Sequence, residues 1–254
     1  MIQADMNLTA KYQPKRAQYW AKIDRFFDTL PPRLFEQSVL LKNNLATFYS
    51  DTGQFKDILR REQDLPLLYL HFWLLDDLAG PATPDPADLE QHLFLAMLFT
   101  FAAVYTGQTI RDDSSNIDNS YLFLAQALTQ QADFHLARLF PGVSPFWEYH
   151  HRFWTEYAEA ALLAAARQPP NAELTAQKLA FTKIPVAAVA FSLDQETSLP
   201  QLSQMMDRLN FGWQILTDLA NLRRDLAQRN LTYPLHRAML AAGIDPHQFL
   251  VDVP

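Results

Sequence analysis

Prolines divide this 254-residue sequence into segments of helical length. The breaks fall at residues 31–32, 80–86, 141–142, 169–170 and 200, and apolar residues recur between them at three- and four-residue spacing. With boundaries good to about 2–4 residues, we expect helices at 15–29, 33–50, 63–79, 87–111, 119–139, 145–167, 172–193, 199–229 and 233–242. The pattern predicts an all-α fold.

The composition supports one globular helical bundle. Apolar residues make up 49% of the chain and charged residues 19%, which is enough apolar material for a sizeable core. Only six glycines occur, which argues against a β-rich fold or a glycine-rich nucleotide-binding loop. Because no repeat or composition shift divides the chain, we expect a single domain over residues 1–254.

Charge and hydropathy exclude some classes of binding partner and indicate where the protein is located. A formal net charge of −7 disfavours nucleic acid, although a metal ion would still allow a phosphorylated small ligand. The absence of cysteine excludes thiolate metal sites and cysteine nucleophiles. Residues 1–18 lack the apolar core of a signal peptide, and the apolar stretch Leu93–Val104 is too short to span a bilayer. We therefore expect a soluble, cytoplasmic protein without a transmembrane segment.

The segment 211–234 carries a narrow polar stripe. At about 100° per residue, four side chains fall within roughly 40° of one another on a helical wheel. They are Gln214, Asp218, Asn221 and Asp225. Apolar residues border the stripe, which favours the wall of an internal cavity. The alternative is an exposed acidic face balanced by neighbouring arginines.

Clustered carboxylates require a compensating cation when they are buried. Oxygen ligands from Asp and Asn suit Mg²⁺. A second acidic group is supplied by Asp112 and Asp113, at the end of the expected helix 87–111, where the helix dipole disfavours negative charge. The alternative is a polar turn in which Asp118 caps the next helix.

The stripe resembles the metal-binding motifs of class I isoprenoid synthases. Residues 211–221, FGWQILTDLAN, resemble the second aspartate-rich region of trans-prenyltransferases, and residues 217–225 resemble the metal motif of class I terpene cyclases. The resemblance implies that Asp218, Asn221 and Asp225 are metal ligands. Thr217 and Asn221 depart from the residues preferred in both families.

The first aspartate cluster is similar to the D-D-x(2–4)-D motif of the same superfamily. By that match Asp112, Asp113 and Asp118 are metal ligands, and Asp112, Asp113 and Asp218 carry catalysis. A rival pair, Asp76 and Asp77, ends an earlier aromatic segment but lacks a third carboxylate. We prefer Asp112 and Asp113, because three helical segments then precede the long metal-binding segment, as in prenyltransferases.

The resemblance also implies basic and polar contacts to a diphosphate. A lysine before a kinked segment takes this role in the family, which points to Lys183 before Pro185, with Lys178 as its substitute. The expected diphosphate-binding residues are Arg111, Lys183, Gln214 and Arg224.

These features lead to one functional expectation. The resemblance implies the isoprenoid-synthase bundle with a central active-site cavity, a prenyl diphosphate substrate, and Mg²⁺, with more than one ion. The arginine pair and glycine that follow the first motif in chain-elongating enzymes are missing after Asp118, which favours a terpene synthase or cyclase over a polyprenyl diphosphate synthase. A non-catalytic helical binding module with a degenerate metal site is the alternative of another class. A homodimer is expected only because members of this superfamily commonly form dimers.

Overall fold

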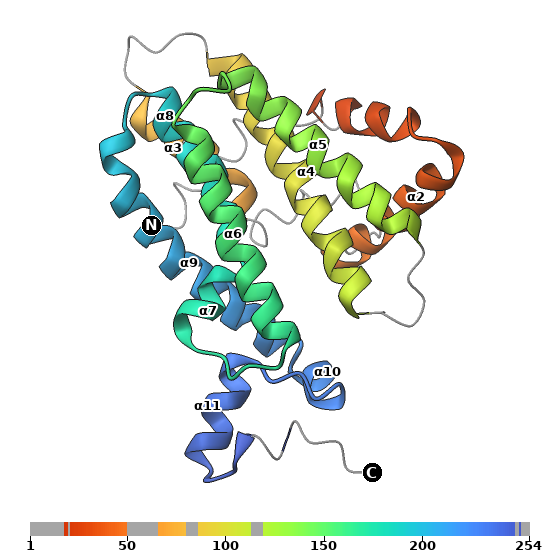
Figure 1. The fold of residues 1–254 in the computed structure, drawn as a ribbon, viewed down its shortest axis with the longest axis vertical. Helices are drawn as coiled ribbons and strands as arrows, with labels where there is room; N and C mark the ends of the chain where they lie inside the picture. Colours follow the sequence, from red (N-terminus) through yellow and green to blue (C-terminus); the bar gives the residue numbers. More distant parts are fainter. Residues whose placement is uncertain are drawn as a thin grey trace, which may run out of the picture. The chain divides into compact units, whose positions relative to one another are not determined.

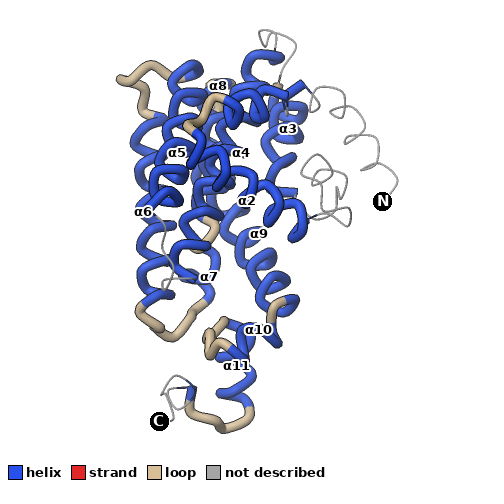
Figure 2. Tube along the Cα trace, turned by 90° about the vertical axis from the view of Figure 1, so that its right-hand side faces the viewer, coloured by secondary structure: helices blue, strands red, loops and turns tan. Residues whose placement is uncertain are grey.

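The computed structural model describes residues 18, 19, 21–49, 66–79, 86–112, 119–246 and 249. Within these ranges, the side chains of residues 42–49, 66–69, 86–87 and 109–112 lie outside the described set. All the described secondary-structure elements are helices (Figure 2), so the predicted all-α class is confirmed.

The chain separates into two compact units, residues 1–144 and residues 145–254. Each unit is described by itself. The expectation of one domain over residues 1–254, and that of a central cavity of the isoprenoid-synthase type, stay predictions.

Helix α4 is the core of the N-terminal unit. After the helical residues 21–28, this unit contains α2 (Pro32–Tyr49), α3 (Pro66–Leu78), α4 (Pro86–Asp112) and α5 (Asn119–Leu139). Helices α4 and α5 lie side by side along much of their lengths (Figure 1). Every residue from Leu93 to Thr100 is buried, so α4 is covered on all sides there. The proline at the start of α4 costs nothing, because the first helical N–H has no partner within the helix.

Hydrophobic contacts on α5 follow a single stripe. Leu124, Leu128, Ala132 and Leu136 are buried at four-residue spacing, as expected for a helix that lies on a neighbour. The observed bounds of α5 match the predicted range 119–139.

The segment Asp88–Gln108 of α4 is long and apolar enough to cross a membrane, judged by length and composition alone. Of that window, 72% is buried inside the protein, and the core helix of a soluble protein meets the same criterion. The described residues therefore contain no clear transmembrane segment.

The C-terminal unit is built on α6 (Phe146–Ala165) and α9 (Leu199–Ala220). Between them lie α7 (Ala172–Gln177), the 3₁₀ turn η3 (Ala180–Thr182), α8 (Lys183–Ser192) and the 3₁₀ turn η4 (Glu196–Ser198). After α9 come α10 (Leu222–Ala227) and α11 (Tyr233–Ala241). Helix α9 contacts α7, η3 and α8, and these segments also contact α6.

Two expected helices are broken in the structure. The predicted helix 172–193 becomes α7, η3 and α8. Pro185 cannot donate a hydrogen bond to the preceding turn, and it is tolerated in the first turn of a helix, where that bond is not made. Pro185 therefore lies in the first turn of a new helix, and the expected bend within a continuous helix is wrong. The predicted helix 199–229 is interrupted at Asn221, where the backbone leaves helical geometry with φ −96° and ψ 5°.

Candidate functional site

Helix α9 presents a line of polar side chains to the rest of its unit. This polar stripe of α9 consists of Asp207, Asn210, Gln214 and Asp218, which recur at three- and four-residue spacing and so share one face. Asn210 and Asp218 are buried, with 0% and 4% exposure. A helix normally buries its apolar face, so the partners of the stripe decide whether it is structural or functional.

The opposite side of α9 is exposed and carries apolar residues beside Gln201 and Arg208. Met205, Leu216 and Leu219 are 40%, 64% and 50% exposed. Gly212 lies on the same side, and a Cβ atom there would meet no other atom within 4 Å. Helix α9 thus buries its polar stripe together with the apolar side chains of Leu199 and Met206, which are 3% and 0% exposed.

The first part of the stripe forms an ion-pair network. Lys183, only 3% exposed, has its Nζ atom 3.0 Å from Oε2 of Glu156 on α6 and pairs also with Oδ1 of Asp207. Arg152 extends the network, with Nε 3.6 Å from Oε1 of Glu156. The ring of Phe153 lies beneath both cations, 5.4 Å from Lys183 Nζ and 4.9 Å from the Arg152 guanidinium carbon. A diphosphate could recruit Lys183 only by displacing the two carboxylates that already hold it.

The second part of the stripe compensates for the break between α7 and α8. Where the helix stops, the carbonyl of Leu179 accepts a hydrogen bond of 3.1 Å from Nδ2 of Asn210. Oγ1 of Thr182 lies 2.9 Å from Oδ1 of Asn210 and 2.8 Å from the same carbonyl. The Leu179 carbonyl also accepts a hydrogen bond of 3.0 Å from the backbone N–H of Thr182, so Asn210 adds a further hydrogen bond to this turn, which is a structural role.

The third part of the stripe holds an incompletely paired carboxylate. Nε2 of Gln214 donates a hydrogen bond of 2.7 Å to Oδ1 of Asp218. Oδ2 of Asp218 is buried without a hydrogen-bond partner. Burial raises the pKa of Asp218, and nearby Asp225 also raises it, while the Gln214 hydrogen bond, the charge of Lys178 and the backbone amide of Tyr233 lower it. A carboxylate in this environment gains stability from an added cation.

Beyond Asp218 the predicted stripe crosses the helix break. Asn221 donates from Nδ2 to the carbonyl of Thr217 at 2.9 Å and ends α9. Asp225, only 3% exposed, lies on α10 and accepts a hydrogen bond of 3.0 Å from Nδ2 of Asn230. Both predicted metal ligands thus have local hydrogen bonds, and Asp225 helps to hold the turn that follows α10.

The residues predicted to contact a diphosphate lie in different environments in the structure. Gln214 lies beside Asp218, whereas Arg224 is exposed on α10. Lys178, the substitute for Lys183, is half-buried at the end of α7, and its charge acts on Asp218. The side chain of Arg111 lies outside the described residues.

The first aspartate cluster belongs to the N-terminal unit. The backbone of Asp112 ends α4, as predicted, but its side chain and the whole of Asp113 and Asp118 lie outside the described residues. The rival Asp76 and Asp77 lie in the last turn of α3, where Asp76 is half-buried and Asp77 exposed. The part of the chain that the structure describes holds no group of three or more His, Asp or Glu side chains arranged for a metal ion. The two-cluster magnesium site stays a prediction.

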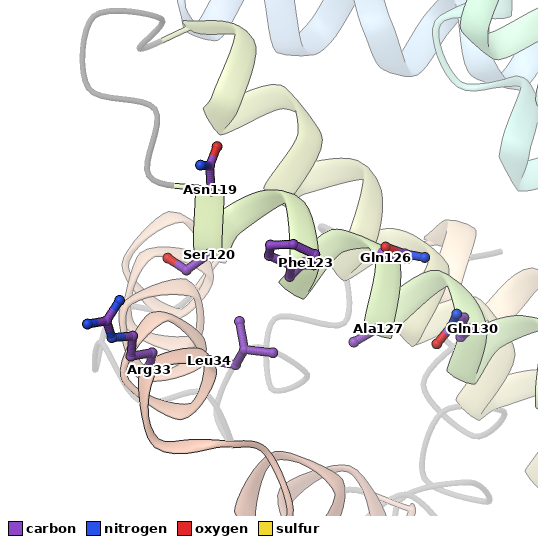
Figure 3. A pocket seen from close by; sticks show the side chains of 8 residues that line it. All are labelled: Arg33, Leu34, Asn119, Ser120, Phe123, Gln126, Ala127 and Gln130. Carbon is purple, nitrogen blue, oxygen red and sulfur yellow. The ribbon is translucent and has the colours of Figure 1, made fainter.

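A groove of about 510 Å³ lies elsewhere, between α2 and α5. Arg33 and Leu34 come from α2, and the other labelled side chains, among them Ser120 and Phe123, come from α5 (Figure 3). The groove contains none of the predicted site residues and no carboxylate or imidazole.

Sequence reasoning missed Asp207 and Asn210. Continuing the helical wheel backwards from Gln214 would have placed both within roughly 40° of it. Their partners, Leu179, Thr182 and Lys183, come from other segments, so no wheel could have identified those contacts.

No protein-family model, no curated protein and no solved structure matches the chain.

Proposed function

We propose that this protein is a Mg²⁺-dependent class I isoprenoid diphosphate enzyme, a terpene synthase or cyclase, with Asp218 in its metal site. The observation that carries the proposal is the buried Oδ2 atom of Asp218, which has no hydrogen-bond partner. An ionised carboxylate in that position is costly unless a cation pairs with it. The sequence around Asp218 resembles the metal motifs of this superfamily, which supports the same assignment.

The donor set of the C-terminal unit fits one side of a magnesium site. Asp218 and Asp225 are buried carboxylates, and the charge of Asp225 acts on Asp218. Mg²⁺ prefers oxygen ligands and retains several waters, so two protein carboxylates and a phosphorylated substrate suffice. Asp112 and Asp113 stay in the proposal as metal ligands on the strength of the sequence resemblance alone.

The basic residues have different roles in this proposal. Lys183 pairs with Glu156 and Asp207, whereas the charge of Lys178 acts on Asp218, so Lys178 is the lysine that contacts the diphosphate in this proposal. Arg224, exposed one residue before Asp225, reaches the substrate from α10. Bound Mg²⁺ would stabilise the departing diphosphate, and the protein's task is to orient the substrate and keep water from the reacting carbon.

A polyprenyl diphosphate synthase is the same-class alternative. It requires isopentenyl diphosphate as a second substrate, so that requirement distinguishes the two reactions.

A non-catalytic helical binding module is the second candidate. Asn221 and Asp225 already have internal hydrogen bonds, and Lys183 already has two carboxylate partners. A site whose groups all serve the fold would leave Asp218 as a remnant. The exposed side of α9, with Met205 and Leu216, would then be a surface for a partner.

The test is incubation of the purified protein with Mg²⁺ and prenyl diphosphates of increasing chain length, with and without isopentenyl diphosphate. Diphosphate release and organic products are measured together. We expect release from a single allylic substrate, abolished by EDTA. Release that needs isopentenyl diphosphate would assign the protein to the synthases that elongate chains. No turnover and no Mg²⁺ binding by folded protein would favour the binding module.

Matched variants locate the site. We expect Asp218→Asn and Lys178→Gln to abolish or strongly reduce release, while Glu196→Gln, an exposed carboxylate on η4, has no effect. Arg224→Ala should reduce release by more than Arg223→Ala, although both arginines are exposed on the same helix. Equal effects of the two arginine variants would contradict the assigned role of Arg224.

A further inference from the structure

Two histidines of the N-terminal unit contact each other across the α4–α5 interface. The Nδ1 atom of His92 on α4 lies 2.9 Å from the Nδ1 atom of His135 on α5. The ring centroids are 5.1 Å apart. Both side chains are half-buried, so the pair is reachable from solvent. None of the predicted magnesium or diphosphate residues belongs to this pair.

The geometry fixes one protonation pattern. Two nitrogen atoms at this distance form a hydrogen bond only when one carries the proton and the other accepts it. One ring is therefore protonated on Nδ1 and the other on Nε2. Neighbouring rings hold the pair in place, since Phe99 stacks on His135 with centroids 5.8 Å apart and Phe134 meets it edge-on at 5.4 Å.

We propose that His92 and His135 form a two-imidazole binding site for a borderline divalent ion, Zn²⁺, Cu²⁺ or Ni²⁺, which joins α4 to α5. The shared proton moves from Nδ1 to Nε2 of its own ring, and both Nδ1 lone pairs then bind the ion. Both rings stay neutral, so the exchange releases no proton. Water occupies the remaining coordination positions, because the residues described around the pair add no third ligand.

The required movement is small. Two imidazole nitrogens bound to tetrahedral Zn²⁺ at about 2.0–2.1 Å lie roughly 3.3 Å apart. The observed separation of 2.9 Å must therefore widen by about 0.4 Å. Side-chain rotation can supply a shift of this size without separating the helices.

Charges around the pair act in both directions. Asp88, one helical turn before His92, offsets part of the ion's charge, while Lys22 and Arg138 oppose it. Burial, with these two cations, lowers the pKa of both histidines, that of His135 to about 4. Neutral imidazole is the form that binds metal, so no proton has to be removed from either ring at neutral pH.

The experiment is calorimetric titration of untagged full-length protein with ZnCl₂ and NiCl₂ in two buffers of different ionisation enthalpy. We expect one ion per chain, no buffer-dependent enthalpy, and a rise in Tm of the N-terminal unit. His92→Gln and His135→Gln should each weaken binding at least tenfold. The matched control is His151→Gln, an exposed histidine on α6, which should bind as the wild type does.

Electron paramagnetic resonance of the Cu²⁺ form adds a readout that does not depend on stability. Nitrogen hyperfine structure from two imidazoles is expected in the wild type and from at most one in either variant. Unchanged affinity in both variants would show adventitious surface binding and overturn the proposal, as would the absence of binding. Because no enzymatic activity is measured, these outcomes are independent of the magnesium site.

Discussion

Lys183 and Glu156 form an ion pair of 3.0 Å between α8 and α6, and Lys183 is almost fully withdrawn from solvent. Asp207 on α9 pairs with the same ammonium group. One buried cation therefore connects three helices. Removing any one member of this group leaves the remaining charges without a partner and lowers the free energy of unfolding.

Replacing Lys183 tests this connection. We expect Lys183→Met to lower the free energy of unfolding of the C-terminal unit by about 2–3 kcal/mol. The loss should stay below that of a fully buried pair, because Glu156 and Asp207 keep 25% and 43% side-chain exposure and can be rehydrated. Urea denaturation measures the change. Lys178→Met, at a half-buried site, should cost less, and the double variant Glu156→Gln/Lys183→Met should recover part of the loss.

The carboxyl group of Asp218 should reduce stability in metal-free protein at neutral pH. Its pKa is raised in the folded state, mainly by burial, so folding favours the protonated form. Its ionisation therefore reduces stability as pH rises above the unfolded pKa of about 3.8. We expect Asp218→Asn to raise the urea midpoint at pH 7 and to leave it unchanged at pH 3. A lower midpoint at pH 7 would contradict this prediction.

Magnesium should reverse the stability difference between the wild type and Asp218→Asn. A bound cation stabilises the ionised Asp218 and therefore only the wild type. Raising the Mg²⁺ concentration at pH 7 should increase the Tm of the wild type and leave that of Asp218→Asn unchanged. The same increase in both proteins would place the ion elsewhere.

His71 should make the N-terminal unit sensitive to acid. Burial without a hydrogen-bond partner lowers the pKa of His71 to about 3. The unfolded chain binds the proton with a pKa of about 6.5. The contribution of neutral His71 to the free energy of unfolding is therefore fully present above pH 6.5. It falls by about 1.4 kcal/mol for each pH unit between 6.5 and 3. His71→Leu should flatten this slope by one proton, whereas exposed His151→Leu should not.

Asn210 should matter through the hydrogen bonds it supplies. Asn210→Leu removes the hydrogen bonds that Asn210 makes with the Leu179 carbonyl and with Thr182, while the hydrogen bonds between Thr182 and that carbonyl remain. We expect a loss of about 1–2 kcal/mol in the free energy of unfolding. Gln204→Leu, at an exposed position of the same helix, should change stability by less than about 0.5 kcal/mol.

The order of helices could be predicted from sequence because prolines and apolar spacing are local signals. The range 119–139 matches α5, and the predicted start near Pro145 matches α6 at Phe146. The breaks at 178–182 and at Asn221 could not be predicted. Residues such as Ala180 and Phe181 do not stop a helix themselves, and the turn at Leu179 receives a further hydrogen bond from Asn210 on another helix.

The candidate site was predictable in part for the same reason. Helical spacing placed Gln214 beside Asp218, which the hydrogen bond of 2.7 Å confirms. The ion pairs of Lys183 depend on residues 27 positions before it and 24 positions after it in sequence. Contacts at that separation are set by packing, so the family resemblance could not reveal that Lys183 was already engaged.

The buried polar stripe of α9 has a consequence for the order in which the chain folds. The partners of Asp207 and Asn210 all lie in the α7–α8 segment and are synthesised before α9. The hairpin of α6 with α7 and α8 can therefore await α9 with its polar acceptors and donors in place. Until that docking occurs, the polar side of α9 stays hydrated, and α9 has no stable position in the nascent protein.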